Sequence, residues 1–469
     1  MRIRACLLGF YLVALSLVVG CGGVRRLDAA PPDDEKGSSS GGGGADAEAP
    51  ELPACLATPF ESTFASASAD VRSLQAVADL ECNVLFAGMV WGALDLGQGP
   101  LGDATTSFSI FLAKLDPSGK LLWAKRLPPG AYLSEGVELA VDAEGSAVLG
   151  GLLEGDVDFG DGVLPVDGAG SEDELFVAKF DHDGGLVFSK RIGGDTVGEI
   201  YTDRRIQAVD VDADGNILVA GDFEGTLELG GGFEPQGGGM FVAKLDPLGH
   251  ELWARQLGTQ YGGDQSGGAA FFDGGSVAFA AACGPGADLG AGSLSSDAAS
   301  ICFAAYTADG TFLCQQSFAG AFNSLVGALG ALPGGGFFLM GLSAGDIDLG
   351  GRILDANDAV HGFAIELGPD GTPRWGRMPV DGLTSGYLGG VATDEARFVA
   401  GFREDCSAGC FHHDVLAFDG SGNAVELAPG LAPEDAESIR VGVDRSRHLL
   451  VSSFRVPMPE TAEIHLVRR

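Results

Sequence analysis

Two short segments alternate along most of this chain, and their repetition constrains the fold more than any other feature. The first is FVAKLDPLGHELWARQLG, and it and its relatives stand at 111–127, 176–194, 241–258, 302–318, 363–378 and 414–429. The second is VDVDADGNILVAG, and it and its relatives stand at 77–88, 140–151, 209–221, 271–281, 331–341, 391–401 and 442–453. Self-similarity at a period of 51 to 65 residues indicates one supersecondary unit copied along the chain.

Each unit is expected to form two β-hairpins, because apolar segments alternate with turns rich in Gly and Asp. Seven units of four strands predict an all-β fold, a seven-bladed β-propeller of four-stranded antiparallel blades. The last unit ends in EIHLVRR at 463–469 and lacks its outer strand, which PFESTFAS at 59–66 stands in the frame to supply. An N-terminal strand would then close the ring by joining the last blade. A linear β-solenoid, which needs no such split unit, is the alternative.

The strings F-V-A-K-L-D-x-x-G-x-x-x-W and V-D-x-x-G-N-x-x-V-x-G recur through residues 59–469. On these strings the chain resembles the bacterial β-propeller repeat family called SBBP. That family is common in secreted and surface proteins of bacteria, including lipoproteins of myxobacteria. The resemblance implies a propeller fold and an exported protein, and it implies no single activity.

The first 20 residues have the features of a signal peptide. Arg2 and Arg4 form the positive end, and the apolar stretch 7–19 is too short for a stable membrane span. The stretch runs into VVGC at 18–21, which resembles the lipobox of bacterial lipoproteins. The resemblance implies that Cys21 is lipidated and becomes the first residue of the mature protein. An ordinary signal peptide with a chance Cys is the alternative.

A flexible tether is expected at 21–53, because its Gly, Ser, Pro and acidic residues cannot bury a core. The predicted propeller domain then occupies 54–469. By analogy with other lipoproteins, Gly22 after the lipidated Cys favours the outer membrane, facing either the periplasm or the outside. The membrane, through the lipid on Cys21, is the first expected partner. Nucleic acid is excluded as a partner, because 65 acidic residues stand against 28 basic ones.

One acidic position recurs in the long connections between hairpins. Asp95, Asp158, Glu228, Asp288 and Asp348 each stand in a motif of the form DLG, DFG or ELG. A ring of carboxylates for Ca²⁺ or for a polycationic partner is one interpretation. The other is a side chain that caps its own turn by accepting backbone N–H groups. Asp210, Asp212 and Asp214 spell the opening of a calcium loop, but Gly221 stands where an EF-hand needs Glu, so a plain hairpin turn is favoured. No cofactor is required, and Ca²⁺ remains open.

Disulfides are expected among the seven cysteines of the exported domain. Cys302 and Cys314 replace an aromatic pair of the other repeats, and we expect them to face each other and to bond. The Cys406 and Cys410 pair predicts a second disulfide, although His412, His413 and Asp414 raise a zinc alternative. Cys55 and Cys82 would fasten the closing strand, which leaves Cys283 over.

The innermost strands offer polar residues without a recognisable catalytic pattern: Gln75, Glu138, Gln207 and Arg440. The recurrent Lys114, Lys179 and Lys244 are expected on a solvated strand face, and His182 and His250 at solvated turns. Long connections such as 152–174 and 223–239 should emerge on one face of the ring, which becomes the candidate binding surface.

These features favour a lipid-anchored cell-envelope propeller that works as a non-catalytic binding or scaffold module, with a protein or glycan ligand. One alternative is an envelope polysaccharide lyase or hydrolase with residues gathered from the long loops. A second alternative is an outer-membrane protein-assembly lipoprotein.

Overall fold

A computed structural model describes the chain from residue 59 onward. The described residues are 59–67, 69–102, 105–128, 136–153, 155–164, 174–194, 204–230, 237–258, 265–294, 299–320, 324–332, 335–356, 360–380, 389–392, 397–405, 410–425, 431, 436, 438–443, 449–455 and 461–468. Two units divide the chain at residues 54 and 55, and every described residue belongs to the second unit. The predicted signal peptide, the tether, Cys21, Cys55 and Cys406 lie outside the described residues.

The described chain forms antiparallel four-stranded sheets, most of which follow the chain order. Three of these sheets come from the first half of the domain. One contains β2 (Ala69–Ala78), β3 (Val84–Gly92), β4 (Thr105–Leu115) and β5 (Leu121–Arg126). The next contains β6 (Glu138–Val141), β7 (Ala147–Leu153), β10 (Glu174–Phe180) and β11 (Leu186–Ile192). The third contains β12 (Arg205–Val211), β13 (Ile217–Phe223), β14 (Gly239–Leu245) and β15 (Glu251–Leu257).

The second half repeats the same pattern. One sheet contains β16 (Gln265–Phe272), β17 (Ser276–Cys283), β18 (Ser300–Tyr306) and β19 (Phe312–Ala319), with a 3₁₀ turn at Asp273–Gly275. The next contains β20 (Leu325–Ala331), β21 (Phe337–Ser343), β24 (His361–Leu367) and β25 (Pro373–Val380). Another contains β26 (Gly389–Ala392), β27 (Arg397–Asp405), β28 (Cys410–Phe418) and β29 (Ala424–Val425).

The last sheet joins both ends of the described chain. It runs β30 (Ser438–Val443), β31 (Leu449–Arg455), β32 (Thr461–Arg468) and then β1 (Phe60–Ala67). β1 pairs with β32 along its whole length, from Phe60 opposite Arg468 to Ala67 opposite Thr461. These are the two segments that the sequence predicts to pair. A single parallel pair, Ala69 with Thr461, links this sheet to β2.

Two short hairpins lie in the connections between strands. β8 (Val157–Asp158) pairs with β9 (Val163–Leu164), and β22 (Ile347–Asp348) pairs with β23 (Ile353–Leu354). β22 also joins the edge of β19 through Asp348 and Ala319. None of the described helical segments has the length and apolar character of a membrane span.

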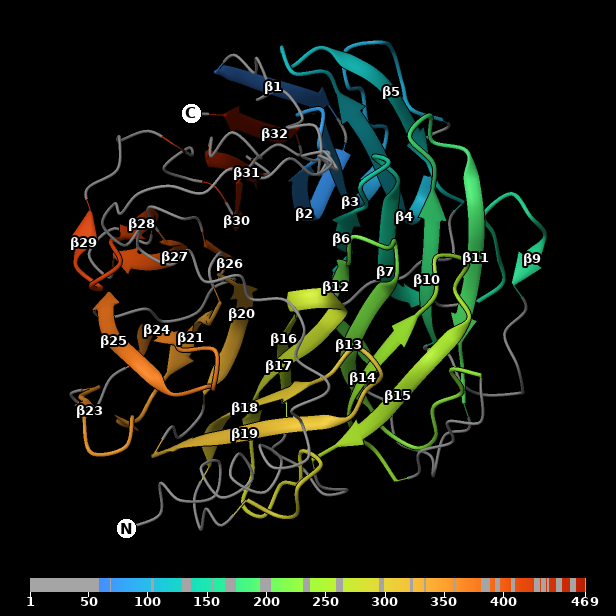
Figure 1. The fold of residues 1–469 in the computed structure, drawn as a ribbon. Coiled ribbons are helices and arrows are strands. Elements are labelled where there is room, and N and C mark those ends of the chain that lie inside the picture. The colour runs from blue at the N-terminus through green and yellow to red at the C-terminus, as the bar shows by residue number, and fades with distance from the viewer. Residues whose placement is uncertain are drawn as a thin grey trace, which may run out of the picture. The chain divides into compact units, whose positions relative to one another are not determined.

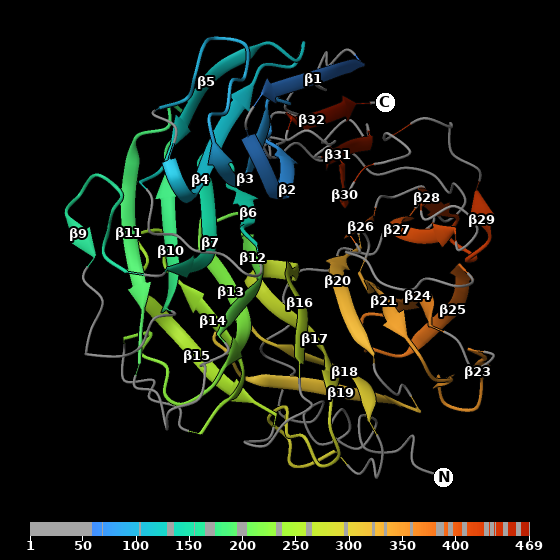
Figure 2. The same ribbon diagram turned by 180° about the vertical axis from the view of Figure 1, so that it is seen from behind.

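The first strand of each sheet lies beside the first strand of the next. β2 contacts β6, β6 contacts β12, and the contacts continue through β16, β20, β26 and β30 back to β2. Figure 1 shows these strands around a common centre, with β5, β11, β15, β19, β25, β29 and β1 farthest from it. The reverse view in Figure 2 gives the same arrangement. Four-stranded sheets set face to face around a centre form a β-propeller.

A recurrent pairing of glycine with phenylalanine fills the middle of the sheets. Gly88 stands opposite Phe111, Gly221 opposite Phe241, and Gly341 opposite Phe363. The three rings are buried. Because a Cβ atom at Gly221 would lie 2.9 Å from the Phe241 ring, the aromatic side chain occupies the space that the glycine leaves open.

The recurrent lysines on the third strands are buried, so the predicted solvated face is wrong. Lys114, Lys179 and Lys244 are 5%, 7% and 3% exposed. Their ammonium groups lie 2.9, 2.8 and 3.0 Å from the carboxylates of three equally buried aspartates at the turns of the first hairpins, Asp79, Asp142 and Asp212. The apolar residues on either side of each lysine concealed this role, since burying a charge requires a partner that sequence alternation does not reveal.

The outer strands attach each sheet to the turn of the next one. Trp123 Nε1 donates to the carbonyl of His182, and Trp253 Nε1 donates to the carbonyl of Ala308, both at 3.0 Å. The ring of Phe60 in β1 takes the equivalent place over the turn at Gly119, and Ser62 Oγ donates to the Gly119 carbonyl at 3.4 Å. β1 therefore packs against the first sheet as the other outer strands pack against their neighbours.

Candidate functional site

A cavity of about 500 Å³ lies where the first strands of the sheets meet. Six strands supply its described lining: β2, β6, β12, β16, β20 and β30. A cavity of this volume falls within the usual range of small-molecule sites, roughly 300–1,000 Å³. Because every lining strand is held in a sheet, the cavity is built on rigid elements rather than on loops.

The strand registers define which residues lie at the same level around the cavity. Glu138 stands opposite Gly150, twelve residues later in its hairpin, and each of the other five strands has one residue with the same spacing to its partner. This level contains Gln75, Glu138, Ala208, Gly268, Ala328 and Arg440. The level two residues further along contains Val77, Ala140, Asp210, Ala270, Gly330 and Gly442.

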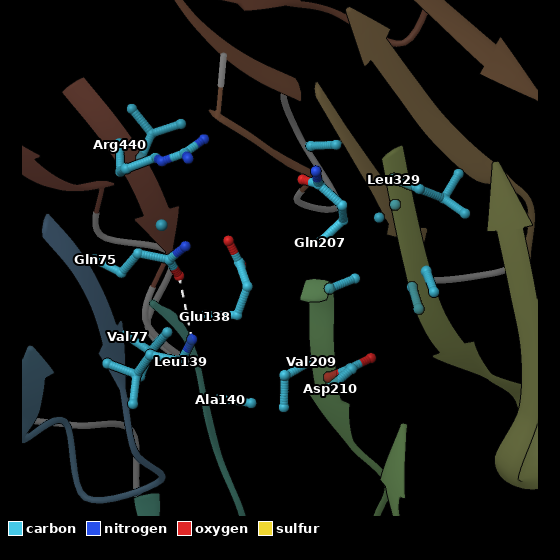
Figure 3. Close-up of a pocket in the computed structure, with 18 of the residues that line it drawn as sticks. Gln75, Val77, Glu138, Leu139, Ala140, Gln207, Val209, Asp210, Leu329 and Arg440 are labelled. Carbon is cyan, nitrogen blue, oxygen red and sulfur yellow. Dashed lines mark hydrogen bonds between the residues drawn. The ribbon is translucent and has the colours of Figure 1, made fainter. Parts of the chain in front are cut away.

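The polar residues of the first level lie on one side. Arg440, Gln75 and Glu138 come from β30, β2 and β6, which are consecutive neighbours around the cavity. Figure 3 shows these three side chains and Gln207 of β12 directed towards the same open space. The sequence offers these four residues as scattered candidates, whereas the fold gathers them. We call Arg440, Gln75, Glu138 and Gln207 the polar arc.

Gln75 holds Glu138 in place. Its amide oxygen accepts the Leu139 N–H at 3.3 Å, a bond drawn in Figure 3, and its side chain also hydrogen-bonds the Glu138 carboxylate. Burial raises the pKa of Glu138, and the charge of Arg440 and the bond from Gln75 act in the opposite direction. Glu138 is thus an oriented carboxyl group in a partly desolvated position facing a guanidinium.

A β-bulge directs Gln207 into the cavity. The register of β12 against β13 shifts between Ile206 and Ala208, so Gln207 is the extra residue. The corresponding bulges in β16 and β20 contain Gly267 and Gly327. A Cβ atom at Gly267 would lie 2.2 Å from Cβ of Val326, so close packing between β16 and β20 requires glycine there.

Phe271 and Leu329 line the opposite side of the cavity together with a larger number of small residues of β16 and β20. The small residues include Gly268, Ala269, Ala270, Gly327, Ala328 and Gly330. No heavy atom lies within 4 Å of the place where a Cβ atom of Gly330 would stand, so this side leaves open room. The cavity therefore has charged and amide side chains on one side and mainly Gly and Ala, with Phe271 and Leu329, on the other.

Asp210 places a second carboxylate in the lining, and sequence reasoning did not select it for the cavity. Its oxygens accept the Phe271 N–H and the Val211 N–H, both at 2.8 Å. Burial, with a smaller contribution from the nearby Asp212 charge, raises the pKa of Asp210 to about 6 against the opposing effect of these hydrogen bonds. The sequence could have identified Asp210 as a cavity residue by its position. It lies four residues after Ile206 on an inner strand, at the level where the sister strands carry Ala, Val or Gly.

Asp212, which follows Asp210 in the run Asp210, Asp212 and Asp214, has different surroundings. Asp212 pairs with Lys244 and accepts the Asp214 and Asn216 N–H groups at 3.0 and 2.8 Å. Asp210 instead faces the cavity. The hydrogen bonds of Asp212 are those of a tight hairpin turn rather than of a calcium loop.

The acidic positions of the long connections cap their own turns. Asp95 Oδ1 accepts the N–H groups of Gly97 and Gly99 at 2.8 and 3.0 Å. Asp158 and Asp288 make the same pair of bonds to the glycines two and four residues later, and Asp348 accepts the Gly351 N–H at 2.6 Å. Glu228 differs, because its backbone N–H donates to the Gly193 carbonyl. Within the part of the chain that is described, no group of three His, Cys, Asp or Glu side chains is placed to hold a metal.

The predicted bond between Cys302 and Cys314 is wrong, because Cys302 is bonded to Cys283. In the β18–β19 hairpin, Cys302 stands opposite Ser317 and Cys314 opposite Ala305, so the two cysteines do not face each other. Cys283 lies diagonally across from Cys302 on β17, with 5.9 Å between the Cα atoms. Cys283 was expected to be the cysteine left over, but it forms this disulfide. Cys314 is instead a buried thiol outside it.

The sequence held a signal for the correct pairing. Where sister sheets set Gly on the second strand opposite Phe on the third, this sheet sets Ala281 opposite Cys302. The joint change shows that the residue at 302 pairs with the second strand. Cys82 is disulfide-bonded and its predicted partner Cys55 lies outside the described residues. The Cys406–Cys410 pair also includes an undescribed residue and stays a prediction, and so does the zinc alternative there.

The two histidines at hairpin turns bond neighbouring acids. The ring of His182 lies 3.1 Å from the Asp183 carboxylate, and His250 Nδ1 lies 2.9 Å from Asp246. Both His side chains are exposed. The long connections 152–174 and 223–239 include segments outside the described residues, so the long-loop face stays a prediction.

Comparison with known proteins gives structural likeness alone. No family model and no curated protein matches the chain. The β-propeller domain of the Trilobed protease from Pyrococcus furiosus is similar at 8% identity and a TM-score of 0.44, over 86% of this chain and 94% of that one. A polysaccharide lyase of family PL25, an ulvan lyase, is similar at 11% identity and a TM-score of 0.48, over 87% and 96%. A subtype N10 neuraminidase-like protein from a little yellow-shouldered bat virus is similar at 8% identity and a TM-score of 0.38, over 87% and 98%.

Proposed function

We propose that this chain is a lipid-anchored protein of the cell envelope whose β-propeller works as a non-catalytic binding or scaffold module. The observation that carries the binding role is the cavity at the inner strands, where Arg440, Gln75, Glu138 and Gln207 point from consecutive strands into the same open space. A concave site with a few convergent polar groups is the usual form of a ligand site.

We further propose that the propeller has seven blades and is closed by β1. Three observations support this. The contacts between first strands return from β30 to β2, and β1 supplies the fourth strand beside β32. Phe60 over Gly119 and Ser62 at the Gly119 carbonyl link that strand to the first sheet. Closure of this kind protects sheet edges and joins the chain ends.

A binding role is favoured over hydrolysis or lyase chemistry by how the two cavity acids are held. Asp210 accepts two backbone N–H groups, and Glu138 is bonded by Gln75 beside the charge of Arg440. The two acids also stand at different levels of the cavity. These arrangements fix charged groups for recognition, whereas general acid–base catalysis needs a proton donor and acceptor that converge on one bond.

The lipid anchor rests on VVGC at 18–21 and on the resemblance to bacterial lipoproteins. Metabolic labelling with a radioactive fatty acid tests it. The wild-type chain is expected to incorporate label and to fractionate with the outer membrane, and Cys21→Ala is expected to do neither. Equal labelling of the variant would contradict the anchor. Protease treatment of whole cells then distinguishes the two faces of that membrane.

The binding role is tested by isolating the native lipoprotein from cells with its bound molecules, beside the Arg440→Gln variant. A molecule retained by the wild-type chain and lost from the variant supports binding at the cavity. Turnover of an envelope polysaccharide by the purified protein would instead support the lyase or hydrolase alternative. Co-purification with the outer-membrane barrel-assembly machinery would support an assembly role.

A further inference from the structure

The repeat allows a direct comparison inside the cavity, because six equivalent strands each place one residue at the same level. At the level of Glu138, three of these strands carry Ala208, Gly268 and Ala328. The ring of first strands therefore packs with small residues at this level. Long polar groups on the other three strands cost free energy to bury, so their presence points to a role beyond packing.

The position of the long groups is also uneven. They occupy three consecutive strands, β30, β2 and β6, and face β16 and β20, whose lining residues are Gly and Ala apart from Phe271 and Leu329. Polar groups that served only to hydrate the cavity would have no reason to gather on one side. A small guest can instead contact the polar arc and place its remaining atoms against the opposite side.

The charges of the lining select the kind of guest. Arg440 offers a planar guanidinium, which binds a carboxylate through two parallel hydrogen bonds. Glu138, oriented by Gln75, and Asp210 offer carboxylates that attract an ammonium group. A purely anionic guest meets repulsion from these two acids, and a purely cationic guest meets repulsion from Arg440.

We propose that the cavity binds a small zwitterion, a free amino acid or a short unblocked peptide, with its carboxylate at Arg440 and its ammonium group at Glu138. This inference rests on the proposed binding function and adds the class of ligand to it. The volume of about 500 Å³ admits a guest of this size within the range of small-molecule sites.

The test is calorimetric titration of the full mature lipoprotein in detergent with L-alanyl-L-alanine. Two blocked forms of the same dipeptide serve as matched probes: the N-acetyl form lacks the ammonium group, and the C-terminal amide lacks the carboxylate. We expect the free dipeptide to bind at least about tenfold more tightly than either blocked form, since each lost charge pair costs about 1.4 kcal/mol or more.

Two variants assign the charges. Arg440→Gln is expected to bind the free dipeptide and its amide equally, and Glu138→Gln is expected to bind the free dipeptide and its N-acetyl form equally. Arg72→Gln and Asp183→Asn change exposed groups of the same kinds outside the cavity and serve as controls. The blocked dipeptides keep the test decisive with the wild-type chain if either cavity variant fails to fold.

Equal affinity of the wild-type chain for all three dipeptides, or no binding at millimolar concentration, would overturn this inference. The binding function would survive that result if the chain still retained a molecule from cells that free dipeptide does not displace. If the wild-type chain isolated from cells retained no molecule at all, both this inference and the proposed binding function would be contradicted.

Discussion

The Lys179 ammonium group lies 2.8 Å from the Asp142 carboxylate, and both side chains are buried inside one sheet of the propeller. The pairs Lys114 with Asp79 and Lys244 with Asp212 repeat this relationship. In the sheet of β16–β19, both partners are replaced together, by Phe272 at the turn and Ala305 on the third strand. In these four sheets the buried lysine and aspartate thus occur together or are replaced together.

Removing one member of the pair should therefore cost more than removing both. Lys179→Ala leaves Asp142 buried without its ammonium group, and we expect a loss of about 3–5 kcal/mol in the free energy of unfolding. The double variant Asp142→Phe with Lys179→Ala copies the natural replacement and should recover part of that loss. Urea unfolding followed by circular dichroism measures both, with Lys120→Ala at an exposed site as the control. A double variant less stable than the single one would contradict the pairing argument.

The disulfide between Cys283 and Cys302 predicts a clear chemical result. Peptide mapping without reduction should recover these two cysteines in one linked fragment, and alkylation after unfolding should label Cys314. Cys283→Ala is expected to lower the free energy of unfolding by about 3 kcal/mol, because the disulfide restricts the unfolded chain by closing the loop between Cys283 and Cys302. Cys314→Ala should keep the linked fragment. Recovery of Cys302 bonded to Cys314 would restore the pairing expected from the sequence.

The repeat made the architecture predictable, and pairing details decided where prediction failed. PFESTFAS and EIHLVRR could be matched because the last unit lacked an outer strand, and β1 pairs with β32 in that way. Cys302 was assigned to the wrong neighbour because an aromatic pair in sequence was assumed to be a pair across strands. Lys179 was assigned to solvent because alternation marks faces and does not reveal a buried counter-charge.

The cavity could be predicted only in part. Gln75, Glu138, Gln207 and Arg440 could be placed on inner strands, because each precedes a recognisable hairpin turn. Their grouping depends on β30 lying beside β2, a contact between the two ends of the domain that no local pattern contains. Gln207 further depends on a bulge, which shifts the register by one residue and redirects the side chain.

Asp210 should make the stability of the domain depend on pH. Burial raises the pKa of Asp210 to about 6, above its value in the unfolded chain, so the folded state holds this proton more tightly. The ionised carboxylate then costs folding free energy above pH 6, and that cost disappears as the pH falls towards 4. Asp210→Asn keeps an oxygen to accept the Phe271 N–H and removes the charge. We expect its melting temperature to exceed that of the wild type at pH 8 and to converge with it near pH 4. A difference that did not change with pH would refute this assignment, and Asp183→Asn at an exposed turn is the control.

The closing strand can be tested at Phe60. Its ring is 8% exposed, lies under the Arg468 guanidinium at 5.2 Å from the ring centroid, and covers the turn at Gly119. A Cβ atom at Gly119 would lie 2.8 Å from the ring, and the φ of Gly119 is +85°, so the turn and the ring fit only with glycine. Phe60→Ala should cost about 3 kcal/mol in unfolding free energy through lost burial and a cavity.

The same variant should loosen the junction between the chain ends before the rest of the domain unfolds. We expect faster hydrogen exchange in β1 and β32 of Phe60→Ala, with little change in β13 or β21, because local opening follows the weakest packing. Glu61→Ala, which alters an exposed residue of the same strand, should leave the exchange of β1 and β32 as in the wild type. If the exchange of β1 and β32 were the same in Phe60→Ala and the wild type, the Phe60 ring would not be what holds β1 against the first sheet.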